Sequence, residues 1–167
     1  MAQRNRFVFK MAVGLNCHSI EWDVLYRHMA TQPTNRAIAG DYAFFDKKLK
    51  VMMMRHVMDI VIRLYEHAGQ CTPEEILVFK VIVHDMVNPS VDYFGMLIQL
   101  LGGEVSGHQM TTVFNCLCNV VYMMYCYNVL ECGKQDFFDN VNIMTLGDDH
   151  IMTVSEHCSE FNHTNIQ

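Results

Sequence analysis

The stretch Leu-Gly-Asp-Asp at residues 146–149 places two adjacent carboxylates, Asp148 and Asp149, directly after a glycine. Apolar runs at 141–144 and 151–154 flank it. Apolar runs on both sides of a short Gly-Asp turn predict a β-hairpin that carries the carboxylates at its tip. Adjacent carboxylates repel each other, so we expect a divalent cation such as Mg²⁺ or Mn²⁺ to neutralise them. One pair is weak support for this site, because most exposed Asp-Asp turns are simply solvated.

The composition predicts a globular protein with a substantial core. The chain has 167 residues, of which 51% are hydrophobic and 18% are charged. Charged residues interrupt the apolar runs well before a membrane-spanning length, so no transmembrane segment is expected. The seven cysteines show no Cys-x-x-Cys spacing, which favours reduced, buried thiols over a disulfide framework. The net charge of −6 argues against a complete nucleic-acid-binding surface, but it is compatible with a catalytic fragment whose basic groove lies elsewhere.

A second acidic stretch lies near the middle of the first half of the chain. Residues 36–42 read as a short buried strand that runs into Asp41, where an unpaired acid would be costly. Asp46 follows five residues later and stands where the N-cap of a long amphipathic helix, 47–67, is expected. Asp41 has no comparable structural role, so it is the stronger candidate for a ligand.

The region between these two acidic stretches predicts helices and one polar row. Thr72 followed by Pro-Glu-Glu predicts the start of a helix that runs to about residue 87. An extended run, 93–101, leads into a glycine-rich loop, 102–108, and then into a helix from about 109 to 130. Thr111 and Asn115 lie four residues apart on that helix and therefore share a face.

These elements predict an α+β fold in which a small antiparallel sheet packs on helices. If the strand that ends at Asp41 lies beside the hairpin, Asp41 comes next to Asp148. Carboxylates from two strands could then hold two cations about 3.5–4 Å apart, the arrangement used for in-line phosphoryl displacement. Catalysis of this kind requires positioning and charge neutralisation and no nucleophilic Ser or Cys.

Three ordered motifs resemble those of viral RNA-dependent RNA polymerases, and most closely those of positive-strand, picorna-like viruses. Asp41-Tyr-Ala-Phe-Phe-Asp46 is similar to the first palm motif of that family. Ser106-Gly107 with Thr111 and Asn115 is similar to the second, and Leu-Gly-Asp-Asp at 146–149 to the third. Each motif alone is poor evidence, but the ordered triplet is highly specific.

The resemblance implies a right-hand polymerase palm with partial fingers. It implies a single partial catalytic domain, 1–167, with a fingers insertion at about 51–100. The N-terminal fingers would precede residue 1 and the thumb would follow residue 167. The resemblance further implies RNA-directed RNA polymerase activity, in which a nucleotide is transferred from an NTP to an RNA 3′-hydroxyl.

The resemblance also implies roles for individual residues. The catalytic and metal-binding residues would be Asp41, Asp148 and Asp149, which would bind two Mg²⁺ or Mn²⁺ ions. A nucleotide-binding set would read the ribose 2′-hydroxyl through Asp46 and Asn115, supported by the other motif residues. That set comprises Asp46, Ser106, Gly107, Thr111 and Asn115.

The resemblance also implies binding partners and a location in the cell. The expected partners are an RNA template, a primer or product strand, NTPs and other viral replication proteins. The expected location is the host cytoplasm, at membrane-associated replication complexes. We expect the 167-residue piece to be inactive alone.

One alternative is a non-catalytic α+β module that binds RNA or protein and keeps Asp41 far from Asp148. Another is a two-metal phosphohydrolase, which gives no reason for Ser106, Thr111 and Asn115.

Overall fold

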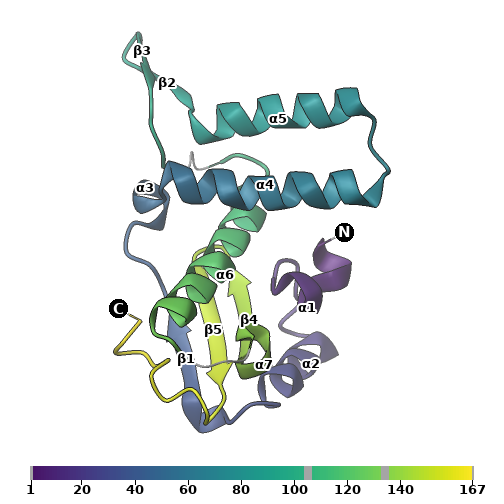
Figure 1. Ribbon diagram of the computed structural model, residues 1–167, viewed down its shortest axis with the longest axis vertical. Helices are drawn as coiled ribbons and strands as arrows, with labels where there is room; N and C mark the ends of the chain where they lie inside the picture. The colour runs from purple at the N-terminus through teal and green to yellow at the C-terminus, as the bar shows by residue number, and fades with distance from the viewer. Residues whose placement is uncertain (1, 104–106, 133–135, 167) are drawn as a thin grey trace. The chain divides into compact units, whose positions relative to one another are not determined.

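The computed structural model describes residues 2–103, 107–132 and 136–166 and divides the chain into two compact units (Figure 1). The first unit combines Met1–Tyr42 with Thr112–Gln167, and the second is Ala43–Thr111. The fold is α+β, as the sequence predicts. The second unit contains the region of about 51–100 that we expected as an insertion. Within the described residues, no helix is long and apolar enough to cross a membrane.

The first unit is built on a three-stranded antiparallel sheet in the order β1-β5-β4. Its strands are β1 (Ala37–Gly40), β4 (Val141–Leu146) and β5 (Asp149–Val154). Leu146 pairs with Asp149, so a two-residue turn of Gly147 and Asp148 joins β4 to β5. Gly147 has a φ of 67°, a conformation that glycine adopts at little cost. The hairpin predicted from the Gly-Asp turn is therefore confirmed.

Helices cover both faces of this sheet. Helix α6 (Thr111–Val129) crosses one face, where Val120 and Met123 belong to the same core cluster as Ile143 and Met152 (Figure 1). On the opposite face, Met144 packs with residues of α2 (Ile20–Met29). Neighbouring strand residues point to opposite faces, so a strand covered on both faces is buried continuously. This explains why β4 is buried throughout, except at Leu146.

The chain before α2 closes the outer edge of the sheet. It forms η1 (Ala2–Asn5) and the short helix α1 (Arg6–Phe9). Met11 then bridges to Thr145 in parallel, and the Thr145 amide donates to the Lys10 carbonyl at 2.9 Å. The apolar residues 7–14 thus form the end of the short helix α1 and a connector. An open strand edge exposes unpaired backbone groups, and this segment satisfies them near the hairpin tip.

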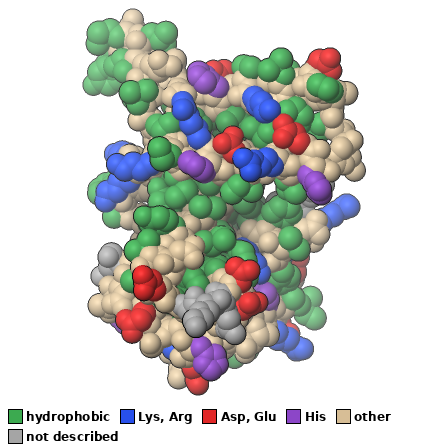
Figure 2. Space-filling view, viewed as in Figure 1, with side chains coloured by type: hydrophobic (Ala, Val, Ile, Leu, Met, Phe, Trp, Pro, Cys, Tyr) green, Lys and Arg blue, Asp and Glu red, His purple; other side chains and the backbone are tan. Residues whose placement is uncertain are grey.

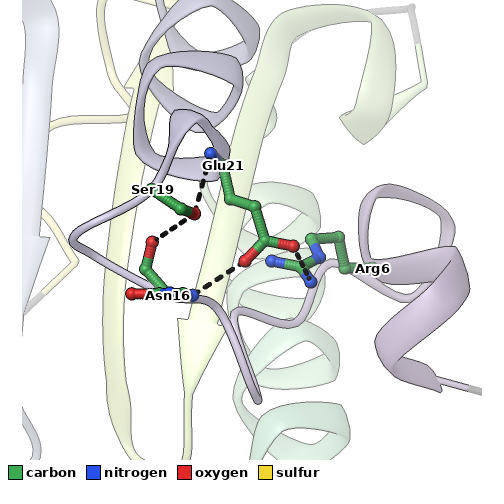
Figure 3. A network of polar contacts seen from close by, with 4 residues as sticks. All are labelled: Arg6, Asn16, Ser19 and Glu21. Carbon is green, nitrogen blue, oxygen red and sulfur yellow. Dashed lines mark hydrogen bonds and ion pairs between the residues drawn. The ribbon is translucent and has the colours of Figure 1, made fainter.

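Four polar residues fix the start of α2 (Figure 3). The Ser19 hydroxyl accepts from the Glu21 backbone amide at 3.2 Å, so Ser19 is the N-cap of α2. The Glu21 carboxylate accepts from the backbone amide of Asn16 at 2.8 Å and forms an ion pair with Arg6 at 2.9 Å. Because Arg6 begins α1, the network ties α1, the connector and α2 together.

Other short elements complete the first unit. The 3-10 turn η2 (Thr34–Arg36) leads into β1, and α7 (Phe137–Asn140) leads into β4. Beyond β5, Phe161 is fully buried and packs edge-on against Tyr127 of α6, with ring centroids 5.5 Å apart.

The second unit begins with two helices where the sequence predicted one over 47–67. Helix α3 (Phe45–Lys48) and helix α4 (Val51–Ala68) are separated by Leu49 and Lys50, which are extended. Leu49 is buried, and its carbonyl accepts from the Gly103 amide at 3.2 Å instead of continuing the helix. Asp46 lies in the first turn of α3 and Phe44 precedes that helix, so the prediction that Asp46 is an N-cap was wrong.

Helix α5 (Pro73–Val87) starts where the sequence predicts and packs along α4. Thr72 and Glu75 form a reciprocal capping box with Pro73 at the first position. Between the two helices, Lys80 forms an ion pair with Glu66 at 3.0 Å. Lys and Arg side chains are interspersed with acidic ones on the visible face of this helix pair (Figure 2).

A β-hairpin replaces the single extended run expected at 93–101. Its strands are β2 (Ser90–Tyr93) and β3 (Met96–Gln99), and Phe94 and Gly95 form the turn. Both turn residues have positive φ, 52° and 82°, which allows a tight reversal. Hydrophobic side chains are exposed at this hairpin (Figure 2).

Candidate active site at the hairpin tip

Three predicted carboxylates lie at one end of the three-stranded sheet. Asp148 is in the β4–β5 turn, Asp149 is the first residue of β5, and Asp41 directly follows β1. The register pairs Gly40 with His150, so the next position along both strands brings Asp41 opposite Asp149. The sequence correctly predicted a strand that ends in an acid beside the hairpin, but it placed Asp41 next to Asp148, whereas the register places Asp41 opposite Asp149.

Asp41 differs from its sequence prediction in one respect. Strand β1 is not buried, because its residues alternate between exposed and half-buried, and Asp41 itself is exposed. The cost of burying a charge therefore does not single out Asp41. Its position at the sheet end, across from the hairpin, is the better reason to consider it a ligand.

Helix α6 holds the hairpin tip through Asn119. This side chain is fully buried, and its Nδ2 group donates to the carbonyl oxygens of Gly147, Asp148 and Asp149 at 3.3, 2.7 and 3.3 Å. Three acceptors on one side leave no doubt about which end of the amide faces the turn. The backbone of both adjacent aspartates is thus attached to the helix.

A second contact comes from Cys116, one turn earlier on α6. Its Sγ accepts from the Gly147 amide at 3.1 Å and lies 3.6 Å from the Thr145 carbonyl, to which the thiol donates. Burial raises the pKa of the Cys116 thiol, and the negative charge of Asp148 adds to this effect against the opposing hydrogen bonds. The thiol therefore keeps its proton at neutral pH and can donate.

Aromatic packing supports the backbone next to Asp41. The rings of Tyr42 and His150 meet edge-on with centroids 5.6 Å apart, and His150 covers Gly40. Burial lowers the pKa of His150, while the charge of Asp149 opposes that shift. Burial also raises the pKa of the Tyr42 hydroxyl. Both rings are therefore uncharged at neutral pH.

The donor chemistry of this sheet end fits a divalent cation, because three carboxylates supply the hard oxygen ligands that Mg²⁺ and Mn²⁺ prefer. Across the described ranges, however, no three His, Cys, Asp or Glu side chains are grouped closely enough to hold a metal ion. The structure thus places the carboxylates on neighbouring chain segments without assembling them into a coordination shell.

The predicted nucleotide-binding residues are distributed over both units. Asn115 is on α6 in the first unit and is buried, and Asp46, Gly107 and Thr111 belong to the second unit. Ser106 lies outside the described residues. Within the second unit, a Cβ on Gly103 would come 3.2 Å from the Asp46 carbonyl oxygen, so the glycine-rich loop passes close to Asp46.

Sequence reasoning missed Asn119 and Cys116 as parts of this site. Asn119 continues the four-residue row that begins with Thr111 and Asn115, so the same spacing could have revealed it. In the part of the chain that the structure describes, the Oδ1 atoms of Asn115 and Asn119 have no hydrogen-bond partner. No sequence pattern distinguished Cys116 from the other apolar positions of α6.

Comparison with known proteins identifies the family. The family model for viral RNA-dependent RNA polymerases matches residues 1–165. This chain belongs to that polymerase family. The family resemblance recognised in the sequence is therefore confirmed.

Related viral polyproteins and one solved polymerase structure agree with this assignment. The chain is 29% identical over 163 residues to the RNA1 polyprotein of Cycas necrotic stunt virus, covering 92% of this chain and 7% of the polyprotein. It is 25% identical over 170 residues to the replicase polyprotein of acute bee paralysis virus (strain Rothamsted), covering 94% and 9%. The fold matches the Sicinivirus 3Dpol RNA-dependent RNA polymerase with a TM-score of 0.69 at 15% identity, covering 87% of this chain and 29% of that one.

Proposed function

We propose that this chain is the palm, with part of the fingers, of a polymerase that synthesises RNA on an RNA template in viral genome replication. One observation carries the proposal. Asp41, Asp148 and Asp149 come from two segments far apart in the sequence and lie at the same end of one sheet. An interaction module would have no need for this convergence of like charges.

The proposed reaction transfers a nucleotide from an NTP to the 3′-hydroxyl of the growing RNA and releases pyrophosphate. Asp41 and Asp148 are the proposed main ligands of two Mg²⁺ or Mn²⁺ ions, and Asp149 supports them. Cations held there would supply Lewis-acid activation of the hydroxyl and would neutralise the charge of the leaving group. The residues of the chain hold and orient the reacting groups.

The proposed nucleotide site discriminates ribose from deoxyribose. Asp46 and Asn115 would contact the 2′-hydroxyl, and Ser106 and Thr111 would support them. The buried Oδ1 of Asn115 has no hydrogen-bond partner among the described residues, and a hydroxyl donor could satisfy it. Gly107 has a φ of 96°, which other residue types rarely adopt, and would let the loop move as nucleotides enter.

The proposed partners are an RNA template, a primer or product strand, NTPs and other viral replication proteins, in the host cytoplasm at membrane-associated complexes. The chain spans 7–9% of these polyproteins and 29% of the matched polymerase. Contacts to the template and the triphosphate would come mainly from the rest of the enzyme. We therefore propose that residues 1–167 alone do not synthesise RNA.

The test is template-dependent nucleotide incorporation by the full-length polymerase that contains this chain. Asp148→Ala and Asp41→Ala should each reduce incorporation to background in the presence of Mg²⁺. Asp139→Ala is the matched control, because Asp139 is an exposed aspartate of the same unit before β4, at the opposite end of that strand from the turn. Wild-type synthesis by Asp148→Ala would refute the proposal. RNA synthesis by residues 1–167 alone would refute the proposed need for the rest of the enzyme.

A further inference from the structure

We propose that Cys116 and Asn119 act together as positioning residues that set the directions of the Asp148 and Asp149 side chains. We refer to these two residues as the α6 clamp. The inference rests on the proposed function, because it assigns a role to residues behind the proposed metal ligands. Neither residue need touch a cation or a nucleotide.

The contacts of Asn119 determine the turn geometry. A side chain leaves its Cα in a direction set by the two peptide planes on either side. The carbonyls of Gly147 and Asp148 mark the planes around the Asp148 Cα, and those of Asp148 and Asp149 mark the planes around the Asp149 Cα. One amide that donates to all three carbonyls therefore constrains both side-chain directions.

Cys116 extends this control toward β4. Its sulfur accepts from the Gly147 amide, which belongs to the peptide plane before the turn, and its proton points to the Thr145 carbonyl. Thr145 is itself tied to the N-terminal segment, because the Ala12 amide donates to its carbonyl at 2.8 Å. The clamp thus connects the turn to two elements that do not carry the carboxylates.

The chemistry of the two side chains suits this role. Both are fully buried, so water does not compete for the turn. Asn119 presents only its donor end to the carbonyls, while its Oδ1 has no hydrogen-bond partner within the ranges described. Aspartate at this position would place an acceptor against three acceptors. Asn119 is thus oriented so that its donor group reaches the turn carbonyls, although its own oxygen has no partner within the described ranges.

The test is Mn²⁺ binding to the full-length polymerase, measured by electron paramagnetic resonance, together with kcat and KM for NTP incorporation. Groups that orient metal ligands typically change metal affinity about 10–100-fold when they are removed. We expect Asn119→Ala to weaken Mn²⁺ binding by about tenfold or more and to lower kcat more than it raises the KM for NTP. Cys116→Ala should act in the same direction, and Cys116→Ser, which can still donate and accept, should restore most of the affinity.

Asn142→Ala is the matched control. Asn142 lies on β4 and, like Asn119, is a buried asparagine; its side-chain amide donates to the His28 carbonyl at 3.2 Å and to the Thr31 hydroxyl at 2.7 Å. Loss of the Asn142 side chain in Asn142→Ala should lower the melting temperature without changing the Mn²⁺ affinity. Equal Mn²⁺ affinity in Asn119→Ala and wild type would overturn the clamp, as would equal weakening in Asn142→Ala. If Asn119→Ala does not fold, the Cys116→Ala and Cys116→Ser pair decides, and equal Mn²⁺ affinity in both would overturn it.

Asp148→Ala separates failure of the clamp from failure of the proposed function. If Asp148→Ala retains RNA synthesis, the proposed function itself is wrong. If Asp148→Ala loses synthesis and Mn²⁺ binding while both clamp variants keep wild-type affinity, the proposed function stands and the clamp is refuted.

Discussion

The imidazole ring of His150 lies where a side chain on Gly40 would be. The two residues are direct partners across β1 and β5, and a Cβ on Gly40 would come 2.5 Å from Cε1 of His150. Real Cβ atoms are not found so close to another heavy atom, so glycine is needed here for space. The pair stands directly beside Asp41 on one strand and Asp149 on the other.

Gly40→Ala should therefore displace His150 and destabilise the first unit. Overpacking of this kind costs about 1–3 kcal/mol. His150→Ala removes the obstacle. Gly40→Ala should therefore cost much less stability in the His150→Ala variant than in the wild-type protein. Thermal and denaturant unfolding of all four proteins would measure the coupling. Additive effects of the two substitutions would contradict the proposed steric conflict.

Phe44→Gly should increase stability. Phe44 has a φ of 61°, a left-handed conformation that costs a residue with a Cβ about 1–2 kcal/mol. Phe44 is 65% exposed, so little packing would be lost, and the contacts that disappear are those of the Lys47 and Lys48 Nζ atoms, 5.6 and 5.8 Å from the ring centroid. After the entropy cost of glycine, we expect a net gain of up to about 1 kcal/mol.

Unfolding measurements on a second position check this reasoning. Phe94 also has a positive φ, 52°, and is 90% exposed at the β2–β3 turn. Phe94→Asn should stabilise for the same reason, because asparagine tolerates this conformation. A loss of stability in both variants would show that the backbone conformation is not the source of strain.

Asp46→Ala should chiefly weaken the selection of ribonucleotides over deoxyribonucleotides. If Asp46 accepts a hydrogen bond from the 2′-hydroxyl, its loss should lower the ratio of kcat/KM values for NTP and dNTP by about tenfold, which corresponds to about 1.4 kcal/mol. Asp85→Ala, a change of an exposed aspartate on α5, is the control. Unchanged discrimination in Asp46→Ala would exclude this role for the carboxylate.

The stability of the first unit should fall as the pH drops below about 6.5, partly because of His28. Burial and the nearby charge of Lys10 lower the pKa of His28 from its ordinary value of 6.5. The His28 ring packs against the Phe7 ring, with the two ring centroids 4.7 Å apart. The unfolded chain then binds more protons than the folded one below pH 6.5, so protonation favours unfolding until the lowered native pKa is passed.

His28→Gln should reduce this acid sensitivity. The measurement is the melting temperature between pH 8 and pH 5, with exposed His157→Gln as the control, which should leave the profile unchanged. Identical pH profiles for wild type and His28→Gln would show that other groups cause the acid sensitivity.

Local sequence patterns determined the elements that depend on neighbouring residues alone. The Thr72–Glu75 capping box and the hairpin at Gly147 need only a few adjacent residues and a backbone preference, so the sequence predicts both correctly. The acidic motifs and the polar row on α6 were sufficient to predict the family.

Long-range packing decided the rest. The break between α3 and α4 depends on a carbonyl of Leu49 that bonds the distant Gly103 amide, and no local pattern encodes that contact. The opposition of Asp41 and Asp149 depends on strand register, which the turn and the buried faces set together. The contacts of Cys116 and Asn119 join residues about 30 positions apart. The sequence alone therefore determined which acids are candidates for the site. The tertiary structure decided that Asp149 lies opposite Asp41 and that Cys116 and Asn119 contact the turn.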